Sequence, residues 1–261
     1  MPIAPMIEAI PKTALITGAA RRIGRAIALL LARQGYAIAI HFHHSRGDAE
    51  SLVEEIAALG GKTALLQADL AREDQVQALL PAAAAALGPI GVLINNASIF
   101  ERDEWNDATR ESWDHHFEPN LRAPFVLIQA FAAALPEDSQ GLVVNMIDQR
   151  VWSPTPHFVS YTLSKAALWT LTQTMALALA PRIRVNAIGP GPALPSPRQT
   201  EAQFARQAGS VPLRRPTSPE EVAKAVLAFL SLPSVTGQML ALDGGQHLQW
   251  SPARSLLPPE E

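Results

Sequence analysis

Tyr161 and Lys165 stand four residues apart in the segment Tyr161-Thr162-Leu163-Ser164-Lys165. On a helix these two side chains share one face, about one turn apart. A nearby lysine charge favours the phenolate and lowers the tyrosine pKa from its usual value of about 10, which makes the phenol a usable proton donor near neutral pH. The spacing therefore predicts a proton-transfer site, although Tyr-x-x-x-Lys also arises by chance.

Asp148 lies upstream of this pair, at the end of a short apolar run. A carboxylate accepts hydrogen bonds and donates none, and it repels the partial negative charge of a carbonyl oxygen. Asp148 therefore suits a substrate that offers N–H donors or ring nitrogens. The alternative is that this carboxylate only caps the end of a strand. Asp148, Tyr161 and Lys165 are the candidate catalytic group.

A second group of residues suits a phosphate. Gly18 and Gly24 frame the loop Thr17-Gly18-Ala19-Ala20-Arg21-Arg22-Ile23-Gly24, which joins a short apolar run to a helical stretch. Gly18 allows a sharp turn, Gly24 allows the start of the helix to pack closely on a sheet, and exposed N–H groups there can face a pyrophosphate. Glycine also favours an ordinary strand-to-helix turn, so the strand–loop–helix context carries the prediction of nucleotide binding.

The segment after the second apolar run distinguishes the two nicotinamide cofactors. An NAD site usually has an acid there that binds the ribose 2′-hydroxyl. This chain has His41-Phe42-His43-His44-Ser45-Arg46, and its first acid is Asp48. The sequence predicts NADPH, because no carboxylate repels a 2′-phosphate and histidine near a phosphate favours its charged form. No metal is expected, since no ligand follows at metal-site spacing.

Alternating strands and helices position these residues. The predicted strands are residues 13–17, 37–41, 63–67, 92–95, 142–146, 184–188 and 238–242, and the predicted helices are 23–34, 48–59, 73–87, 121–135, 161–180 and 219–230. This order predicts a Rossmann-type, doubly wound α/β fold: a seven-stranded, mostly parallel sheet between two helical layers. Ligands bind at the carboxyl ends of such strands, and the polar residues above follow strands directly.

The chain has 261 residues, 48% hydrophobic and 17% charged, with a net charge of -3 and no cysteine. This composition excludes disulfides and gives no reason to expect binding to nucleic acid or to an anionic membrane. Neither a signal peptide nor an apolar stretch of membrane-spanning length is present. We expect a cytoplasmic enzyme with one domain over residues 12–250 and loose tails at 1–11 and 251–261.

These motifs resemble the short-chain dehydrogenase/reductase family over about residues 12–248. The first loop is similar to the family's TGxxxGxG, with Arg22 in place of the middle glycine. That departure is typical of members that resemble pteridine reductases. Most of the family has serine where this chain has Asp148, and the Asp148-Tyr161-Lys165 spacing resembles the triad of pteridine and dihydromonapterin reductases.

The resemblance implies a cofactor site. Ser45 and His44 would contact the 2′-phosphate, and Asp69 would bind the adenine edge unless it only caps the following helix. The segment Asn95-Asn96-Ala97-Ser98 resembles the family's NNAG motif, and Pro190-Gly191 resembles its turn beside the nicotinamide. The cofactor residues implied are Gly18, Arg22, Ile23, Gly24, His43, His44, Ser45, Asp69, Asn95, Ala97, Ser98, Tyr161, Lys165, Pro190 and Gly191.

The resemblance also implies a substrate site. Phe100 would stack a pterin ring against the nicotinamide, unless it is an ordinary core residue, and Asn120 would kink the central helix and support a proton-relay water near Lys165. The stretch 193–209 is expected to be a mobile lid, and Trp152 to line the pocket. The substrate residues implied are Arg22, Ser98, Phe100, Asp148 and Tyr161; Arg22 could instead be a solvated side chain.

The function predicted is NADPH-dependent reduction of a pterin, from the dihydro to the tetrahydro form, by hydride transfer to a C=N bond. One alternative is a carbonyl reductase that keeps Asp148 in the serine position. Another is a dinucleotide-binding protein without catalysis, which the presence of both Tyr161 and Lys165 disfavours. The resemblance further implies a homotetramer that packs through the central helices.

Overall fold

Seven parallel strands form one sheet in the computed structural model, which describes residues 10–196 and 198–249. Their order is β3-β2-β1-β4-β5-β6-β7, so the order reverses between β1 and β4. The strands are β1 (Thr13–Ile16), β2 (Ala37–Phe42), β3 (Thr63–Gln67), β4 (Val92–Asn95), β5 (Gly141–Met146), β6 (Ile183–Pro190) and β7 (Met239–Leu242). The predicted strands match these bounds to within two residues at each end.

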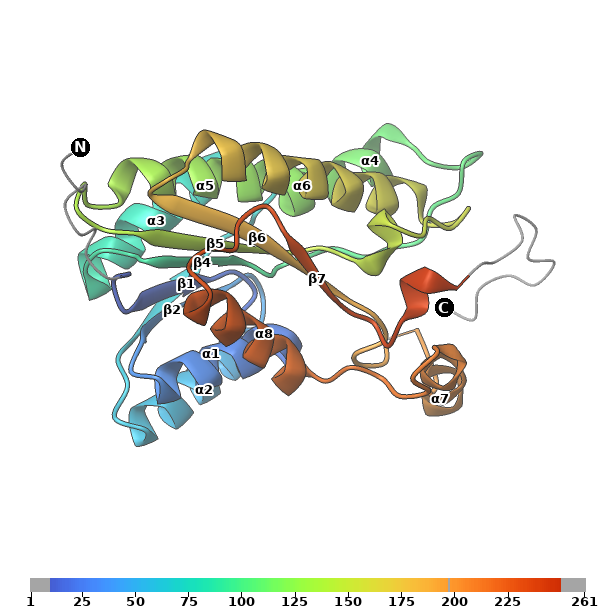
Figure 1. Cartoon of the computed structure of the whole chain (residues 1–261), viewed down its shortest axis with the longest axis horizontal. Coiled ribbons are helices and arrows are strands. Elements are labelled where there is room, and N and C mark those ends of the chain that lie inside the picture. Colours follow the sequence, from blue (N-terminus) through green and yellow to red (C-terminus); the bar gives the residue numbers. More distant parts are fainter. Residues whose placement is uncertain (1–9, 197, 250–261) are drawn as a thin grey trace.

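Helices cover both faces of the sheet, which gives the predicted three-layer α/β/α architecture. Figure 1 shows α3, α5 and α6 on one face and α1, α2 and α8 on the other. These helices are α1 (Arg22–Arg33), α2 (Arg46–Ala58), α3 (Glu73–Leu87), α5 (Ala123–Ala134), α6 (Val159–Ala178) and α8 (Pro219–Ser231). None of the described helices combines the length and the apolar character that a membrane crossing requires.

Alternate residues of the central strands enter two separate cores. In β1, Ala14 and Ile16 pack toward α1 and α8, whereas Leu15 packs toward α3 and α5. Successive side chains of a strand point to opposite faces of the sheet, so a strand covered on both faces must be apolar at every position. This explains why the central strands are short continuous apolar runs in the sequence rather than alternating ones.

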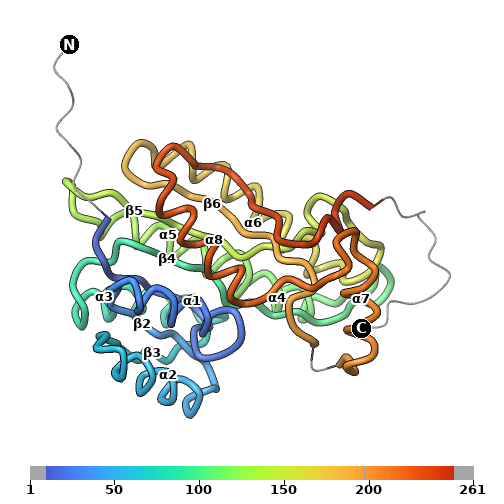
Figure 2. Tube along the Cα trace, turned by 60° about the horizontal axis from the view of Figure 1, so that its bottom comes forward, coloured from blue at the N-terminus to red at the C-terminus, as the bar shows by residue number. Residues whose placement is uncertain are grey.

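Two short helices were missed by the sequence analysis: α4 (Arg110–Phe117) and α7 (Glu201–Ser210). Each begins with a capping box, in which Thr109 pairs with Ser112 and Thr200 pairs with Gln203. The stretch 193–209, which was expected to be a mobile lid, therefore contains most of the helix α7, and its mobility stays a prediction. Threonine followed three residues later by glutamine is a recognisable start signal for a helix. Figure 2 shows α7 set apart from the two helical layers.

A π turn, Glu118–Arg122, joins α4 to α5. It contains Asn120, the residue at which the family resemblance implied a kink in the central helix. Pro119 and Pro124 flank Asn120 and have no N–H to give to a regular helical ladder. The turn buries the Asn120 side chain completely and directs its amide toward the loop after β4.

The predicted N-terminal tail is too long. Ile10 packs against the core on the α1 side, and the carbonyl of Pro11 accepts a hydrogen bond from Thr13 N, so residues 10 and 11 belong to the folded part. The apolar side chain of Ile10 gains by burial, which the following Pro11 does not prevent. The remaining tail residues, 1–9, and the tail predicted at 251–261 lie outside the described residues.

Candidate active site

A cleft opens at the carboxyl ends of β4, β5 and β6, where polar residues from several elements meet. Its walls come from the start of α1, the loops after these three strands, α6 and α7. The lining residues include Arg22, Ile23, Asn96, Ser98, Phe100, Met146, Asp148, Gln149, Arg150, Tyr161, Lys165, Pro190, Gly191, Ser196, Gln199 and Gln207. Most of the residues predicted for the substrate and for the nicotinamide end of the cofactor therefore share this cleft.

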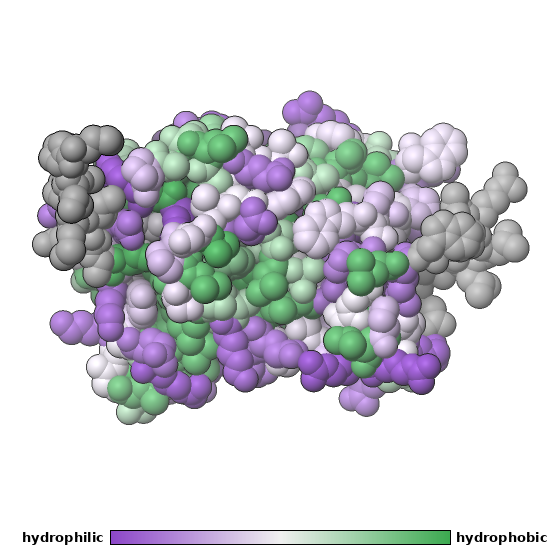
Figure 3. All heavy atoms as spheres, viewed as in Figure 1, coloured by the Kyte–Doolittle hydropathy of each residue, from purple (hydrophilic) through white to green (hydrophobic). Residues whose placement is uncertain are grey.

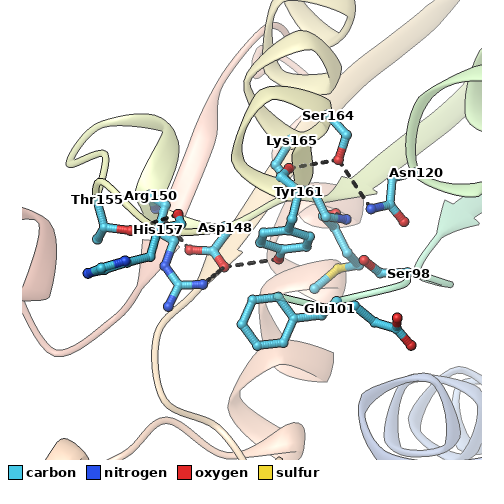
Figure 4. A network of polar contacts seen from close by, with 12 residues as sticks. Ser98, Glu101, Asn120, Asp148, Arg150, Thr155, His157, Tyr161, Ser164 and Lys165 are labelled. Carbon is cyan, nitrogen blue, oxygen red and sulfur yellow. Dashed lines mark hydrogen bonds and ion pairs between the residues drawn. The ribbon is translucent and has the colours of Figure 1, made fainter. Parts of the chain in front are cut away.

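Tyr161 and Asp148 are in direct contact. The Tyr161 hydroxyl donates a hydrogen bond of 3.0 Å to Asp148 Oδ2, and Figure 4 shows the two side chains pointing toward one another. Asp148 Oδ1 accepts from Arg150 N at 2.9 Å and so caps the 3-10 turn Gln149–Val151. The cap and the contact with Tyr161 thus coexist, because the two carboxylate oxygens make different bonds.

Lys165 lies one turn after Tyr161 on α6 and is 2% exposed. Its Nζ donates a hydrogen bond of 2.8 Å to the carbonyl of Met146, at the end of β5. Burial lowers the pKa of Lys165 to about 8, although the charge of Asp148 acts in the opposite direction. The ammonium is therefore close to its titration range at physiological pH, and small changes in the cleft alter its charge.

Arg150 is a cleft residue that the sequence analysis missed. Its Nη1 lies 4.0 Å from Asp148 Oδ2, and its guanidinium lies over the rings of Phe100 and Phe158 at 5.2 and 5.1 Å. Asp148 is therefore flanked by a cation and does not present an isolated charge. The signal was available in the sequence, because Arg150 follows Asp148 by two residues.

Phe100 lines the cleft, as the resemblance implied. Its ring stacks on Phe158 at a centroid distance of 4.6 Å and meets Tyr161 edge-on at 4.6 Å and 70°. The carbonyl of Phe100 accepts a hydrogen bond of 2.8 Å from Arg198, whose guanidinium also lies over the ring. Phe100 is thus part of an aromatic cluster that includes the proton-donor candidate, and it is not an ordinary core residue.

Asn120 fixes the backbone that precedes Phe100. Its amide exchanges two hydrogen bonds of 2.9 Å with the N–H and the carbonyl of Ile99, and it donates a third to Ser164 Oγ at 3.2 Å. Ser164 is the neighbour of Lys165 on α6. The observed contacts of Asn120 therefore connect the loop after β4 to α6 and do not reach the lysine directly.

The loop between β1 and α1 is compact because of its two glycines. Gly18 has a φ of +62°, and a Cβ there would lie 3.1 Å from the Cα of Ala97. A Cβ on Gly24 would collide with the carbonyl oxygen of Gly18 and would lie 2.7 Å from Asn96 Nδ2. Only glycine fits at either position, which leaves the backbone N–H groups at the start of α1 accessible to a ligand.

Asn96, which was not among the predicted site residues, supports this loop. The Asn96 amide donates to the carbonyls of Thr17 and Gly18 at 2.8 and 3.1 Å. Asn95 is 2% exposed and donates to Asn145 Oδ1 inside the sheet, because alternate residues of a strand point to opposite faces. The side chain of Asn95 thus ties β4 to β5, and the cofactor contact that the resemblance implied for Asn95 stays a prediction; Ala97 packs against Gly18.

His41 holds the same loop from β2 and was not among the predicted site residues. The N–H of Gly18 donates to His41 Nδ1 at 3.0 Å, and His41 Nε2 lies 3.1 Å from the carbonyl of Ala68. These partners assign the proton to Nε2 of a neutral ring. Burial lowers the pKa of His41 to about 4, so the ring stays neutral and remains an acceptor.

The residues predicted to hold a 2′-phosphate are exposed or half-buried after β2. His43 and His44 lie side by side with ring centroids 3.5 Å apart, and Ser45 precedes α2 without capping it. Asp48 accepts a hydrogen bond of 2.6 Å from Arg21 and forms an ion pair with it. The nearest acid is thus neutralised, and the described residues include no group of three metal-binding side chains.

Asp69 does not cap α3, whose N-cap residue is Arg72. Its Oδ1 accepts from Ala71 N at 2.9 Å and closes a turn before that helix, while its own N–H donates to Gln75 Oε1 at 2.7 Å. The N-cap alternative is wrong because the turn separates Asp69 from the first helical residues. The half-buried carboxylate lies after β3, where the adenine edge was predicted to bind.

Arg22 connects the first loop to the stretch before α7. Its guanidinium donates to the carbonyls of Pro195 and Leu194 at 2.9 and 3.3 Å. Arg22 has a φ of +51°, an uncommon conformation for a residue with a Cβ. The alternative of a purely solvated side chain is wrong, because Arg22 bridges two walls of the cleft.

This fold and this cleft define a dinucleotide-binding oxidoreductase. A family model described as Enoyl-(Acyl carrier protein) reductase matches residues 18–247. The 3-oxoacyl-[acyl-carrier-protein] reductase FabG of Staphylococcus epidermidis is 32% identical over 243 residues, which cover 91% of this chain and 99% of that protein. The chain belongs to the short-chain dehydrogenase/reductase family.

Two solved structures are similar to this chain at higher sequence identity. The FolM alternative dihydrofolate reductase 1 of Brucella suis, in complex with NADP, is 49% identical, with a TM-score of 0.89 over 92% of this chain and 96% of that chain. The corresponding protein of Brucella canis, also complexed with NADP, is 46% identical, with a TM-score of 0.88 over 93% and 98%. These neighbours confirm the predicted resemblance to the pteridine reductase-like members of the family.

We predict a pH-dependent contribution of His41 to stability. Between its folded pKa of about 4 and the ordinary histidine pKa of 6.5, the unfolded chain binds a proton that the folded chain does not. The free energy of unfolding therefore falls as the pH falls through this window, by up to about 3 kcal/mol from this residue. His41→Asn keeps an acceptor near Gly18 N and should flatten this part of the profile.

Thermal unfolding followed by circular dichroism from pH 7 to pH 4 measures this contribution. His43→Asn is the matched control, because His43 is exposed and should keep the wild-type profile. Parallel pH profiles of the wild type and His41→Asn would show that His41 is not buried as a neutral ring.

Proposed function

We propose that this chain reduces a dihydropterin to a tetrahydropterin with NADPH as the hydride source. The observation that carries the proposal is the hydrogen bond from the Tyr161 hydroxyl to Asp148 Oδ2 beside Phe100. It pairs a proton donor with an acceptor of N–H groups, next to an aromatic ring on which a flat heterocycle can stack. The similarity to FolM dihydrofolate reductases supports the same substrate class.

The first loop and the end of β2 fit an NADP dinucleotide. Gly18 and Gly24 leave the backbone at the start of α1 free to approach a pyrophosphate, since a Cβ at Gly24 would clash with the loop. After β2, His43, His44 and Ser45 can surround a 2′-phosphate, and Asp48 is already paired with Arg21. Both Brucella relatives were solved with NADP, which supports the same cofactor here.

When bound, NADPH would supply the hydride for the carbon of the substrate C=N bond. Tyr161 holds the proton for the adjacent nitrogen on its hydroxyl, and Asp148 Oδ2 orients that hydroxyl. Asp148 can also accept an N–H of the ring, which places the nitrogen near the phenol. Lys165 contributes a buried positive charge one helical turn away and is anchored by the carbonyl of Met146. The substrate gains one C–H and one N–H bond.

The second candidate function is carbonyl reduction, and the 32% identity to FabG proteins favours it. A carbonyl reductase needs a hydrogen-bond donor against the substrate oxygen, and Tyr161 supplies one. At position 148, however, a carboxylate would face the same oxygen and accept no bond from it. A binding protein without catalysis is a third candidate, and the contact between Tyr161 and Asp148 argues against it.

We also propose a homotetramer. A mostly apolar hollow on the outer side of the central helices is lined by Phe117, Leu121, Phe125 and Leu171, with Glu118 and Arg122 at its polar rim. Figure 3 shows a further band of apolar side chains over α8 and β7, where Leu240 is 40% exposed. Contiguous apolar surface of this kind supports subunit contacts on two faces, as a tetramer with twofold symmetry requires.

The substrate proposal predicts which reaction oxidises NADPH. The loss of NADPH absorbance is followed with 7,8-dihydrobiopterin, with a 3-oxoacyl thioester and with a panel of simple ketones. We expect kcat/KM to be highest with the pterin by about tenfold or more. Tyr161→Phe, which removes the proton donor, should lower the rate by about two to four orders of magnitude. Turnover of ketones without turnover of pterins would refute the proposal.

Asp148→Ser tests the role of the carboxylate. A serine hydroxyl can still cap the turn at Arg150 N, so the backbone should be retained. We expect kcat/KM for the pterin to fall by about two orders of magnitude, because the acceptor for the ring N–H is lost. The Kd of NADPH, measured by fluorescence titration, should stay within about twofold. Equal losses of reduction and of NADPH binding would identify Asp148 as purely structural.

The buried charge of Lys165 predicts the alkaline side of the pH profile. Lys165 is protonated below its pKa of about 8 and neutral above it. If the positive charge supports proton donation by Tyr161, kcat/KM for pterin reduction falls as the pH rises through this value. Initial rates from pH 6 to pH 10 measure this limb, and a profile that stays flat to pH 10 would contradict the assignment.

A further inference from the structure

A buried chain of hydrogen bonds joins the loop after β4 to the start of α6, outside the catalytic group. Glu101 N donates to His116 Nε2 at 3.0 Å, and His116 Nδ1 lies 2.7 Å from Ser160 Oγ. Ser160 Oγ in turn donates a short hydrogen bond to Asp103 Oδ2. His116, Ser160 and Asp103 are 1%, 0% and 5% exposed, so water does not compete for these bonds.

The direction of every proton in this chain follows from Asp103. Its carboxylate only accepts, so the Ser160 hydroxyl must donate to it and is left as an acceptor for His116 Nδ1–H. His116 Nε2 then carries no proton and accepts from Glu101 N. Burial lowers the pKa of His116, which favours this neutral form. A serine that donates to aspartate is not an activated nucleophile, so the three residues are not a hydrolytic triad.

Asp103 also caps the helix that carries Tyr161. The residue before α6, Phe158, has a φ of +57° and provides no side-chain cap. Instead Asp103 Oδ1 accepts from Ser160 N at 3.1 Å, and the carbonyl of Asp103 accepts from Val159 N at 3.3 Å. A buried carboxylate at this end also interacts favourably with the helix dipole. The start of α6 is therefore fixed by a residue about 57 positions earlier in the chain.

Two members of this hydrogen-bond chain are sequence neighbours of the two rings in the cleft. Glu101 follows Phe100 and Ser160 precedes Tyr161. On the other side of Phe100, both backbone groups of Ile99 are held by Asn120. Phe100 and Tyr161 meet edge-on at 4.6 Å and 70°. The backbone next to each of these two residues is thus held by hydrogen bonds.

We propose that Asp103, Ser160 and His116 are positioning residues that set the placement of Phe100 relative to Tyr161, and thereby the geometry in which a flat substrate meets the proton donor. The role in substrate placement rests on the proposed pterin reduction. The placement of the two rings does not depend on it, because the chain is complete without a ligand.

Ser160→Ala tests the proposal by removing one hydroxyl from the middle of the chain. We expect kcat/KM for 7,8-dihydrobiopterin to fall by about tenfold or more, mainly through KM, while the Kd of NADPH changes by less than about twofold. Ser218→Ala is the matched control, because that hydroxyl accepts from Glu221 N and caps α8, away from these hydrogen bonds. It should lose stability and keep wild-type kinetics.

A spectroscopic measurement tests ring placement without any substrate. The protein has two tyrosines, Tyr36 and Tyr161. In a Tyr36→Phe background, ultraviolet difference absorbance therefore reports the ionisation of Tyr161 alone. Lys165 moves with Tyr161 on α6, whereas Asp148 belongs to the end of β5. The Asp148 carboxylate stabilises the neutral phenol, because it accepts its hydrogen bond and repels the phenolate. Displacement of α6 removes this effect, so in Ser160→Ala the phenol should ionise at a pH lower by about half a unit or more.

The outcomes separate this proposal from the proposed function. If the wild type reduces the pterin and Ser160→Ala matches it in both kinetics and tyrosine titration, the positioning role is refuted. If the wild type does not reduce pterins, the proposed function fails, and the titration of Tyr161 alone decides the positioning role. If Ser160→Ala does not fold, Asp103→Asn is judged by the same two measurements, since its amide no longer fixes the direction of the protons.

Discussion

The hydrogen bond between the Tyr161 hydroxyl and Asp148 Oδ2 is the contact on which the functional interpretation depends. It forms because β5 ends at the carboxyl edge of the sheet and α6 passes over that edge, with Lys165 anchored to the last residue of the strand. Asp103 holds the first residues of α6 through hydrogen bonds from Val159 N and Ser160 N. One side-chain contact thus requires the topology of the sheet, the start of a helix and the loop after β4 to be correct together.

The strands of the sheet could be predicted because buried parallel strands have a simple sequence pattern. Residues of β1 and β5 face a core on both sides, so they are short apolar runs that an irregular segment would not tolerate. Asp148, Tyr161 and Lys165 were found for a different reason, since their spacing resembles a known triad. The helix α7 was missed although Thr200 and Gln203 form a capping box, because the prolines before it dominated the prediction.

Apart from Arg150, which lies two residues from Asp148, the residues that the sequence analysis missed share one property: their partners are distant in the sequence. His41 binds Gly18 across 23 positions, Asn96 binds the same loop across 78, and His116 meets Ser160 across 44. Nothing in the local sequence of a histidine or an asparagine distinguishes such a contact from solvent exposure. Which of Asn95 and Asn96 supports the loop could not be read from the sequence for a related reason, because the alternation of the strand had to be known to one residue to say which amide faces the loop.

The surroundings of Asp148 refine the argument about substrate. Arg150 lies 4.0 Å from Oδ2 and Lys165 carries a buried charge nearby, so the field that a substrate meets is not that of a lone carboxylate. Repulsion of a carbonyl oxygen is weakened by these cations. The cations do not change the direction of the hydrogen bond, because a carboxylate oxygen has no proton to donate whatever cations surround it. The preference for a ring nitrogen over a ketone therefore follows from donor and acceptor matching, and net charge contributes less.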